Sequence, residues 1–120
     1  MALKLKRAYE APARGDGTRV LVDRLWPRGI AKEKAEIDLW LKEIAPSNTL
    51  RKRFHTKPEK WGDFLKAYFA ELDTGEADDQ AKELRRHMRK GTVTLLYAAR
   101  DEKHNNAVAL KAWLTRKQKP

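Results

Sequence analysis

Apolar residues recur with two spacings along this chain of 120 residues, and the spacings separate strands from helices. Residues 3–9 alternate apolar and basic side chains, a pattern typical of a strand with one wet face or of an edge strand protected by lysines. Residues 19–24 have a continuous β-branched and aliphatic centre, which suits a strand covered on both faces. Residues 92–98 have a similar composition. The pattern therefore predicts three strands.

Apolar positions three and four residues apart predict helices over much of the remaining chain. One such stripe predicts a helix over residues 33–44, which Pro46 ends because the residue before a proline disfavours the helical conformation. Residues 61–72 carry the clearest stripe in the chain. Residues 77–88 carry another, with Gly91 placed where a helix commonly terminates. The stripe over residues 33–44 consists of Ile37, Trp40, Leu41 and Ile44.

Capping residues indicate where other helices begin. Ser47 is suited to cap a short helix that runs through Phe54. Residues 56–59, Thr-Lys-Pro-Glu, form a capping box in front of the next helix. Asp101 is expected to cap a final helix that ends near Thr115. Together these segments predict about five helices.

The order of the elements predicts an α/β protein with a single domain over residues 1–120, a length that suits one domain. Helices between the second and third strands indicate that these two strands pair in parallel. The loop at residues 10–18 is short for a parallel crossover, so the direction of the first strand stays open. We therefore expect a short, mainly parallel sheet of three strands packed by about five helices.

The chain is strongly basic, with 27 Lys and Arg against 17 Asp and Glu and a formal net charge of +10. This charge favours a polyanionic partner such as nucleic acid, and it equally fits a role in solubility. The chain has no cysteine and three scattered histidines, and it lacks glycine-rich phosphate and dinucleotide motifs. We therefore expect neither a metal nor a cofactor. No signal peptide or membrane-spanning run is visible, so we expect a cytoplasmic protein without a membrane partner.

Two strand exits carry most of the unusual chemistry, at residues 23–29 and 97–106. Ligands of open α/β sheets bind beyond the carboxyl ends of the strands, and parallel strands would bring these two loops together. The final helix would begin there as well, with free N–H groups that favour anions. We expect a phosphate-bearing small molecule or nucleotide between the loops. The candidate ligand-binding residues are Arg24, Trp26, Arg28, Tyr97, Arg100, Asn105 and Asn106.

Structural alternatives accompany each of the charged candidates. Asp23 and His104 are weak candidates for acid–base catalysis, and Asp23 is better suited to organise neighbouring arginines. Arg24 and Arg28 are equally suited to bind an anion or to pair with Asp23 or Glu33. An anion site would be contradicted if both arginines were engaged in internal salt bridges and no cavity lay beside them.

The remaining candidates are open to similar alternatives. Trp26 is better suited to anchor its loop than to stack on a base, and Tyr97 fits a core strand. A second set, Ser47, Arg51 and His55, surrounds the short helix that Ser47 is expected to cap. Its basic side chains are ordinary for a solvated helix face. They would extend the strand-exit patch if they contacted a phosphate.

Several blocks of the sequence resemble one known family. These blocks are VDRLWPRGI, APS with LRKRFH, EKW, and TLLYAARD with HNNAVAL. They are similar to the YeaO-like branch of the bacterial domain of unknown function 488, and the resemblance extends from Leu5 to Leu114. It implies a small cytoplasmic α/β domain with several helices on a short sheet. It implies no established activity.

Departures from the family pattern narrow the possible chemistry. More distant members have Asp-Val-Arg where this chain has Asp23-Arg24, and cysteines near the exit of the third strand. This chain has Tyr97 and Asn105-Asn106 there, so thiol chemistry is excluded. The nearer branch has Asn-His before the alanine, where this chain has Asn105-Asn106 preceded by His104.

Three functional hypotheses follow from these residues. The first is an anion-binding domain whose ligand lies between the two strand-exit loops. The second is a nucleic-acid-binding protein that uses its basic surface. The third is an enzyme that processes a phosphoester, with Asp23 or His104 as acid or base. We rank them in this order.

Overall fold

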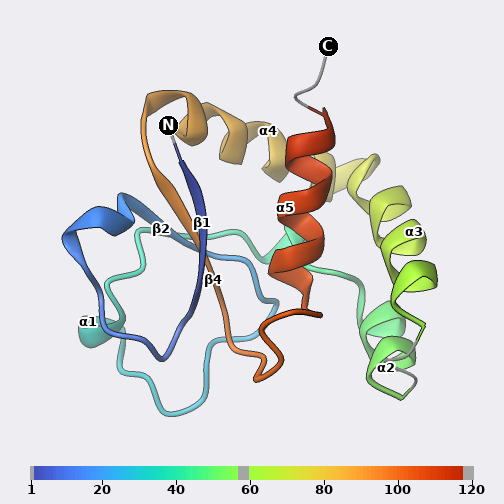
Figure 1. The fold of residues 1–120 in the computed structure, drawn as a ribbon, viewed down its shortest axis with the longest axis horizontal. Helices are drawn as coiled ribbons and strands as arrows, with labels where there is room; N and C mark the ends of the chain where they lie inside the picture. Colours follow the sequence, from blue (N-terminus) through green and yellow to red (C-terminus); the bar gives the residue numbers. More distant parts are fainter. Residues whose placement is uncertain (1, 57–59, 118–120) are drawn as a thin grey trace.

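Four parallel strands form the sheet of the computed structural model, which describes residues 2–56 and 60–117. The strands lie in the order β1-β4-β2-β3, and each neighbouring pair is parallel (Figure 1). The carboxyl ends of all four therefore meet at one edge of the sheet, as the two predicted strand-exit loops require. The strands are β1 (Leu3–Arg7), β2 (Thr18–Leu21), β3 (Leu39–Trp40) and β4 (Val93–Tyr97).

The described residues also form five α-helices and two short 3-10 helices. Helices α2 to α5 lie together on one side of the sheet in Figure 1, and their apolar faces share a core with β2 and β4. The α-helices are α1 (Lys32–Ala35), α2 (Asn48–Thr56), α3 (Trp61–Leu72), α4 (Gly75–Lys90) and α5 (Asn106–Lys117), and the 3-10 helices are η1 (Arg14–Asp16) and η2 (Lys42–Ile44).

Alternate side chains of the internal strands enter two different cores. Val20 and Val22 belong to the large core beneath the helices, whereas Leu21 points to the opposite face. There Leu21 packs with Leu96 and with partly buried residues of the chain that follows β2, including Trp26. The second strand is covered on both faces, as its continuous aliphatic centre predicts.

The helix predicted over residues 33–44 is wrong, and the sheet has one strand more than predicted. Helix α1 ends at Glu36, which has a left-handed backbone with a φ of 47°. The chain then runs along the free edge of β2 as β3, where the backbone N–H of Leu41 donates to the carbonyl of Leu21 at 3.0 Å. Hydrogen bonds to an existing strand edge replace those of a helix.

The apolar stripe behind that prediction is real, but its members are divided between the two faces of the sheet. Leu41 and Ile44 enter the large core, while Ile37 and Trp40 pack with the smaller cluster on the other face. A single helix would have placed all four on one side. Apolar residues spaced as in a helix therefore lie here on a short strand and the chain beside it, and they contribute to both cores.

Of the three residues predicted to cap helices, one is confirmed and two are wrong. The Ser47 hydroxyl accepts the backbone N–H of Leu50 at 3.2 Å, which confirms Ser47 as the cap of α2. Thr56 lies in the last turn of α2 and does not cap α3, and residues 57–59 of the predicted capping box lie outside the described residues. Asp101 does not cap the final helix, because Asn105 accepts the backbone N–H of Val108 at 2.9 Å.

The other predicted elements agree with the structure to within a few residues at each end. The strand predictions correspond to β1, β2 and β4, and the helices at 61–72 and 77–88 correspond to α3 and α4. The first strand, whose direction was open, is parallel to β4 and forms an edge of the sheet. Within the described residues, no helix is both long and apolar enough to span a membrane.

Candidate functional site

A cleft of about 730 Å³ opens at the carboxyl edge of the sheet. Residues that follow β1, β2 and β4 line it together with α2 and the start of α5, so loops 23–29 and 97–106 both contribute to it. Polar and apolar side chains both reach the cleft. Those considered below are Tyr9, Asp23, Arg24, Leu25, Trp26, Arg28, Arg51, His55, Arg100, His104, Asn105 and Asn106.

Asp23 ties the strand exits to the start of α5. One of its carboxylate oxygens accepts the backbone N–H of Ala98 at 2.9 Å, and the other accepts the Asn106 side-chain amide at 2.9 Å. The same Asn106 amide also donates to the carbonyl of Val22 at 3.0 Å. Burial raises the pKa of Asp23, although Asn106, Ala98 and the nearby charge of Arg51 act in the opposite direction. Asp23 is therefore an organiser of the cleft floor.

Arg24 is engaged inside the protein. Its guanidinium donates to the Glu43 carboxylate at 2.9 Å and to the carbonyl of Ala45 at 3.1 Å. Its Nε is buried without a hydrogen-bond partner among the described residues. The partner of Arg24 is thus neither Asp23 nor Glu33. Its contacts fix the chain around η2 against the exit of β2.

The Trp26 indole also has a structural role. Its N–H donates to the carbonyl of Ile30 at 2.7 Å, and its ring packs edge-on against Trp40 at a centroid distance of 5.4 Å. The neighbouring Trp40 indole donates to the carbonyl of Asp23 at 2.7 Å. These contacts anchor the loop after β2, while part of the Trp26 ring still lines the cleft.

Two further candidates, Tyr97 and Asn105, belong mainly to the framework. Tyr97 is buried in the large core and is not among the residues that line the cleft. Burial raises the pKa of its hydroxyl. Asn105 is buried, caps α5 and donates its side-chain amide to the carbonyl of Asp101 at 2.8 Å. Asn105 lines the cleft through a side chain whose hydrogen bonds are internal.

Three arginines on the cleft remain without an ion pair. Arg28 follows β2, Arg100 follows β4 and Arg51 projects from α2, and all three are exposed. Among the described residues, none of them forms a salt bridge with a carboxylate. One of the two predicted strand-exit arginines, Arg24, is therefore engaged. The other, Arg28, lines the cleft together with Arg51 and Arg100.

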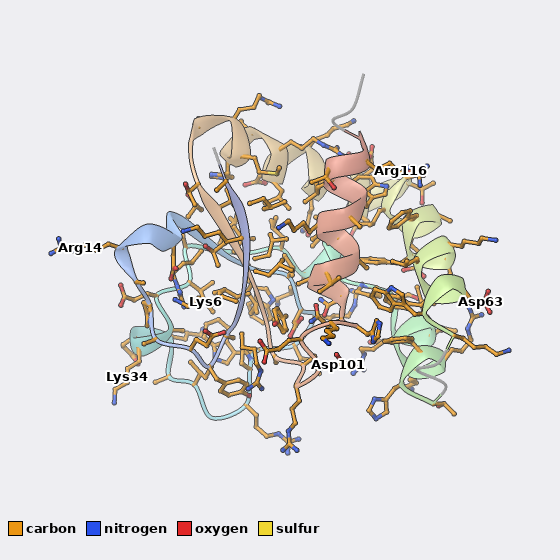
Figure 2. All side chains as sticks on the ribbon, viewed as in Figure 1. Lys6, Arg14, Lys34, Asp63, Asp101 and Arg116 are labelled. Atoms are coloured by element: carbon orange, nitrogen blue, oxygen red, sulfur yellow. The ribbon has the colours of Figure 1, made fainter. Side chains whose placement is uncertain are left out.

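His104 lies at the exposed mouth of the cleft, apart from Asp23. Its Nδ1 is 3.7 Å from the Asp101 carboxylate, and its ring centroid is 5.0 Å from that of Trp61. Figure 2 shows Asp101 beside the start of α5. The two weak catalytic candidates, Asp23 and His104, thus have separate sets of partners. Their hydrogen bonds do not form an acid–base pair.

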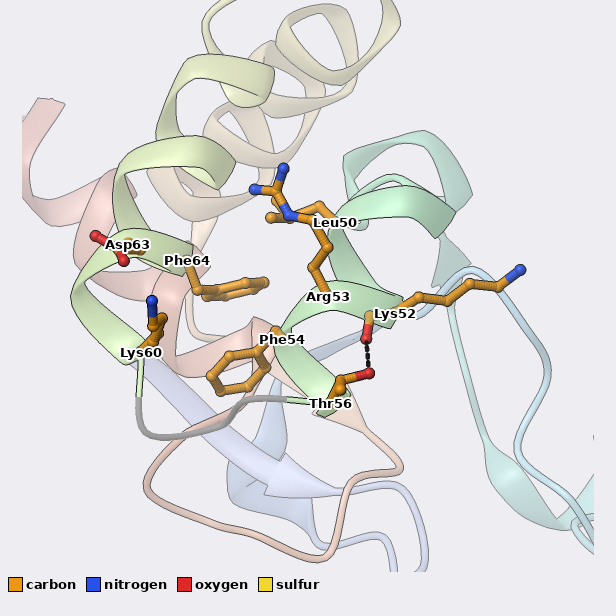
Figure 3. Close-up of a pocket in the computed structure, with 8 residues that line it drawn as sticks. All are labelled: Leu50, Lys52, Arg53, Phe54, Thr56, Lys60, Asp63 and Phe64. Atoms are coloured by element: carbon orange, nitrogen blue, oxygen red, sulfur yellow. Dashed lines mark hydrogen bonds between the residues drawn. The ribbon is translucent and has the colours of Figure 1, made fainter.

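A second cavity of about 500 Å³ lies between α2 and α3 and was not predicted (Figure 3). Leu50, Phe54 and Phe64 supply its apolar surface, and Arg53 lies beside Leu50 in this view. Helix α2 thus carries Arg51 at the cleft and Arg53 at the second cavity. The two arginines therefore lie on the same helix but border different cavities, so each can serve as a control for the other.

Tyr9 and Leu25 also line the cleft but are not among the candidates predicted from the sequence. Tyr9 follows β1, and its hydroxyl donates to the carbonyl of Arg28 at 3.0 Å. A parallel first strand would have placed Tyr9 at this edge, but the short loop after it left that direction open. Leu25 lies inside the predicted loop without having been selected, since nothing in the sequence shows that its side chain is exposed.

The sequence matches the model of a family described as the inactive DUF488-N3 subclade over residues 2–119. It is 42% identical over 114 residues to the uncharacterised protein YeaO of Escherichia coli strain K12, covering 95% of this chain and 97% of YeaO. It is 37% identical over 108 residues to the uncharacterised proteins Rv3073c of Mycobacterium tuberculosis H37Rv and Mb3100c of Mycobacterium bovis, covering 90% of this chain and 89% of each relative. No solved structure matches the chain.

Proposed function

The chain belongs to the inactive DUF488-N3 subclade, and so to the domain of unknown function 488 that its VDRLWPRGI block resembles. We propose that its cleft binds a phosphate-bearing small molecule without converting it. The observation that carries the proposal is a set of three cleft arginines that form no ion pair with another described residue, Arg28, Arg51 and Arg100. They come from three separate segments and border one cleft. A cleft of about 730 Å³ lies within the range of roughly 300–1,000 Å³ found for small-molecule sites.

The chemistry of these side chains suits a phosphate. A guanidinium presents a planar set of donors that matches phosphate oxygens, and it stays charged at all physiological pH values. Asn106, the first residue of α5, lines the same cleft, so the positive end of the helix dipole lies near it. Asp23 adds a negative charge to the floor, but both of its carboxylate oxygens already accept internal hydrogen bonds.

Binding without turnover fits the residues better than catalysis. The raised pKa of Asp23 by itself would suit a general acid or base. However, its oxygens hold Ala98 and Asn106, so a proton transfer would break the contacts that shape the cleft. His104 is exposed and contacts Asp101 instead. The description of the subclade as inactive agrees with this interpretation.

A thermal-shift screen of the full chain at low salt tests the proposal. The compounds are inorganic phosphate, sugar phosphates and nucleoside phosphates, each offered with its dephosphorylated counterpart. A ligand at a hundredfold excess over its Kd stabilises the native state by roughly 2.7 kcal/mol, which gives a readable shift in Tm. We expect phosphorylated compounds to stabilise the protein and their dephosphorylated counterparts to have less effect.

Arg51→Gln and Arg53→Gln form the matched pair for this test. Both arginines are exposed on α2, but only Arg51 lines the cleft. We expect Arg51→Gln to weaken phosphate-dependent binding by about tenfold, or about 1.4 kcal/mol, and Arg53→Gln to leave it unchanged. The proposal fails if no phosphorylated compound stabilises the protein, or if the two variants bind equally.

Nucleic-acid binding is the second candidate, and the composition of α2 favours it. The helix carries Arg51, Lys52 and Arg53 in succession and has no acidic residue. An extended phosphate backbone could contact Arg51 and Arg53 on their different sides of α2, so both glutamine variants would then weaken binding. Its affinity would also fall steeply between low and high salt, because each neutralised phosphate releases counterions. Binding to short DNA or RNA fragments over a salt series distinguishes this outcome from a small-molecule site.

A further inference from the structure

The cleft has an apolar wall in addition to its arginines. Tyr9 and Leu25 are the exposed large hydrophobic residues of the described chain, with 46% and 67% of their surface accessible, and both line the cleft. Trp26 and Pro27 line it beside them. Exposed apolar side chains gathered in one concave surface indicate a ligand that covers them.

Internal contacts hold this wall in place. The Tyr9 hydroxyl donates to the carbonyl of Arg28 at 3.0 Å, which joins the residues after β1 to the loop after β2. The guanidinium of Arg7 lies 5.0 Å from the centre of the Tyr9 ring, and its donors bind the carbonyls of Ala98 and Ala99. The Trp26 indole is fixed by Ile30. Tyr9 and Trp26 are therefore held in position before any ligand arrives.

Cationic side chains border the same space from α2 and from the loop after β4. Arg51 belongs to α2, and Arg100 belongs to the loop. An inorganic phosphate or a sugar phosphate would satisfy these cations but would leave Leu25 and Tyr9 in water. The combination of the two surfaces suits a ligand with an apolar part and an anionic part, and a flat ring could cover both Leu25 and Tyr9.

We propose that the ligand is a nucleoside monophosphate whose base covers Leu25 and Tyr9 and whose phosphate is bound by Arg51 with Arg28 or Arg100. This inference rests on the proposed function, because it assigns a ligand class to the same cleft. The base supplies the flat apolar surface, and its ring edges can form hydrogen bonds at the mouth of the cleft. The phosphate supplies the negative partner that these arginines do not have among the described residues.

Calorimetric titration of the full chain with AMP, GMP, CMP, UMP and ribose 5-phosphate tests the assignment. We expect at least one nucleoside monophosphate to bind at least tenfold more tightly than ribose 5-phosphate, because only the nucleotide covers the apolar wall. Leu25→Ser should remove most of that advantage and leave ribose 5-phosphate binding unchanged. Leu25 is largely exposed, so the variant should fold normally. Arg51→Gln should weaken both classes of ligand.

Three further outcomes separate this inference from the function on which it rests. If ribose 5-phosphate binds as tightly as all four nucleotides, or if Leu25→Ser changes nothing, the nucleotide assignment is wrong while the phosphate site stands. If no phosphorylated compound binds, both proposals are wrong. If the free nucleosides bind as tightly as the monophosphates, the assignment of the phosphate to Arg51 is wrong.

Discussion

The aspartates at the two ends of β2, Asp16 and Asp23, accept hydrogen bonds from different kinds of donor. Asp16, just before the strand, accepts hydrogen bonds from the Arg19 guanidinium, the Lys6 ammonium and the backbone N–H of Ala13. Asp23, just after the strand, accepts hydrogen bonds from neutral donors, Ala98 and Asn106. Among the residues that the structure describes, two cations thus contact the first carboxylate directly and none contacts the second.

The pKa values of the two groups move in opposite directions for this reason. Burial alone would raise the pKa of Asp16, but the Ala13 N–H and the charges of Lys6 and Arg19 lower it overall. Burial also raises the pKa of Asp23. There the Asn106 and Ala98 donors and the more distant Arg51 act to lower the pKa, but it stays raised overall. At Asp16 the Ala13 N–H and two cations in direct contact together outweigh desolvation, whereas at Asp23 the neutral donors and the distant Arg51 do not.

The two ends of the strand also use their cations differently. Around Asp16 the donors of Arg19 all have internal partners, including the carbonyls of Ala35 and Glu36. Figure 2 shows Lys6 turned inward, whereas Arg14 of the same region extends into solvent. Around Asp23 the exposed arginines of the cleft form no ion pair among the described residues. At the amino end of β2 the Arg19 guanidinium is bound by groups inside the protein. At the carboxyl end the exposed arginines of the cleft are available to a ligand.

Asp16→Asn should give the largest effect. Removal of the charge leaves Arg19 and Lys6 partly or fully buried without their counterion, a change that typically costs about 3–5 kcal/mol. Urea denaturation measures the loss in the free energy of unfolding. Asp63→Asn, at an exposed site on α3, is the control and should change the free energy by about 0.5 kcal/mol or less. Equal effects of the two variants would contradict the ion-pair account.

Two glycines with positive φ extend the comparison to the backbone. Gly17 precedes β2, and a Cβ added there would lie 2.2 Å from the carbonyl oxygen of Thr92, far inside contact distance. Gly29 follows β2 with a φ of 83°, but a Cβ there would meet nothing within 4 Å. Gly17→Ala should therefore cost about 3 kcal/mol through strain and overpacking, against about 1 kcal/mol for Gly29→Ala from strain alone. Similar Tm values for the two variants would show that the backbone at Gly17 can move away.

The pH dependence of stability should separate the two aspartates by sign. The folded pKa of Asp16 is lowered, so its stabilisation is present above the unfolded value of about 3.8 and is lost as the pH falls through the folded pKa. The folded pKa of Asp23 is raised, so its contribution is present below about 3.8 and is lost as the pH rises through the folded pKa. Unfolding free energies between about pH 2.5 and pH 6 should rise less steeply in Asp16→Asn and more steeply in Asp23→Asn than in the native chain. Parallel curves for all three proteins would refute the opposite shifts.

The sequence was sufficient to locate both strand exits because the features that mark them are local. Continuous aliphatic residues mark β2 and β4, and parallel pairing follows from the helices between them. The conclusion that loops 23–29 and 97–106 meet required no knowledge of side-chain contacts. The sequence predicts that Asp23 organises the neighbouring arginines, whereas its hydrogen bonds are to Ala98 and Asn106.

The partners of Arg24 and the position of Arg51 depend on contacts that no local pattern records. The stripe from Ile37 to Ile44 fits a helix equally well, and only the free edge of β2 favours a strand there. Once residues 33–44 were predicted as a helix, Glu43 was placed on the wrong element to meet Arg24. Arg51 reaches the cleft because of where α2 packs, which the sequence does not specify.

Asp23→Asn should change stability much less than Asp16→Asn does, and it is the most direct test of the contrast. The asparagine keeps one acceptor oxygen, so it can hold either Ala98 or Asn106 but leaves the other donor unmatched. The variant also removes a charge whose burial is unfavourable, and the net cost should be about 1 kcal/mol. Chemical denaturation at about pH 7 measures it beside Asp16→Asn. A loss as large as that of Asp16→Asn would show that Asp23 depends on the cleft arginines as a direct counterion, and those arginines would then be less available to a ligand.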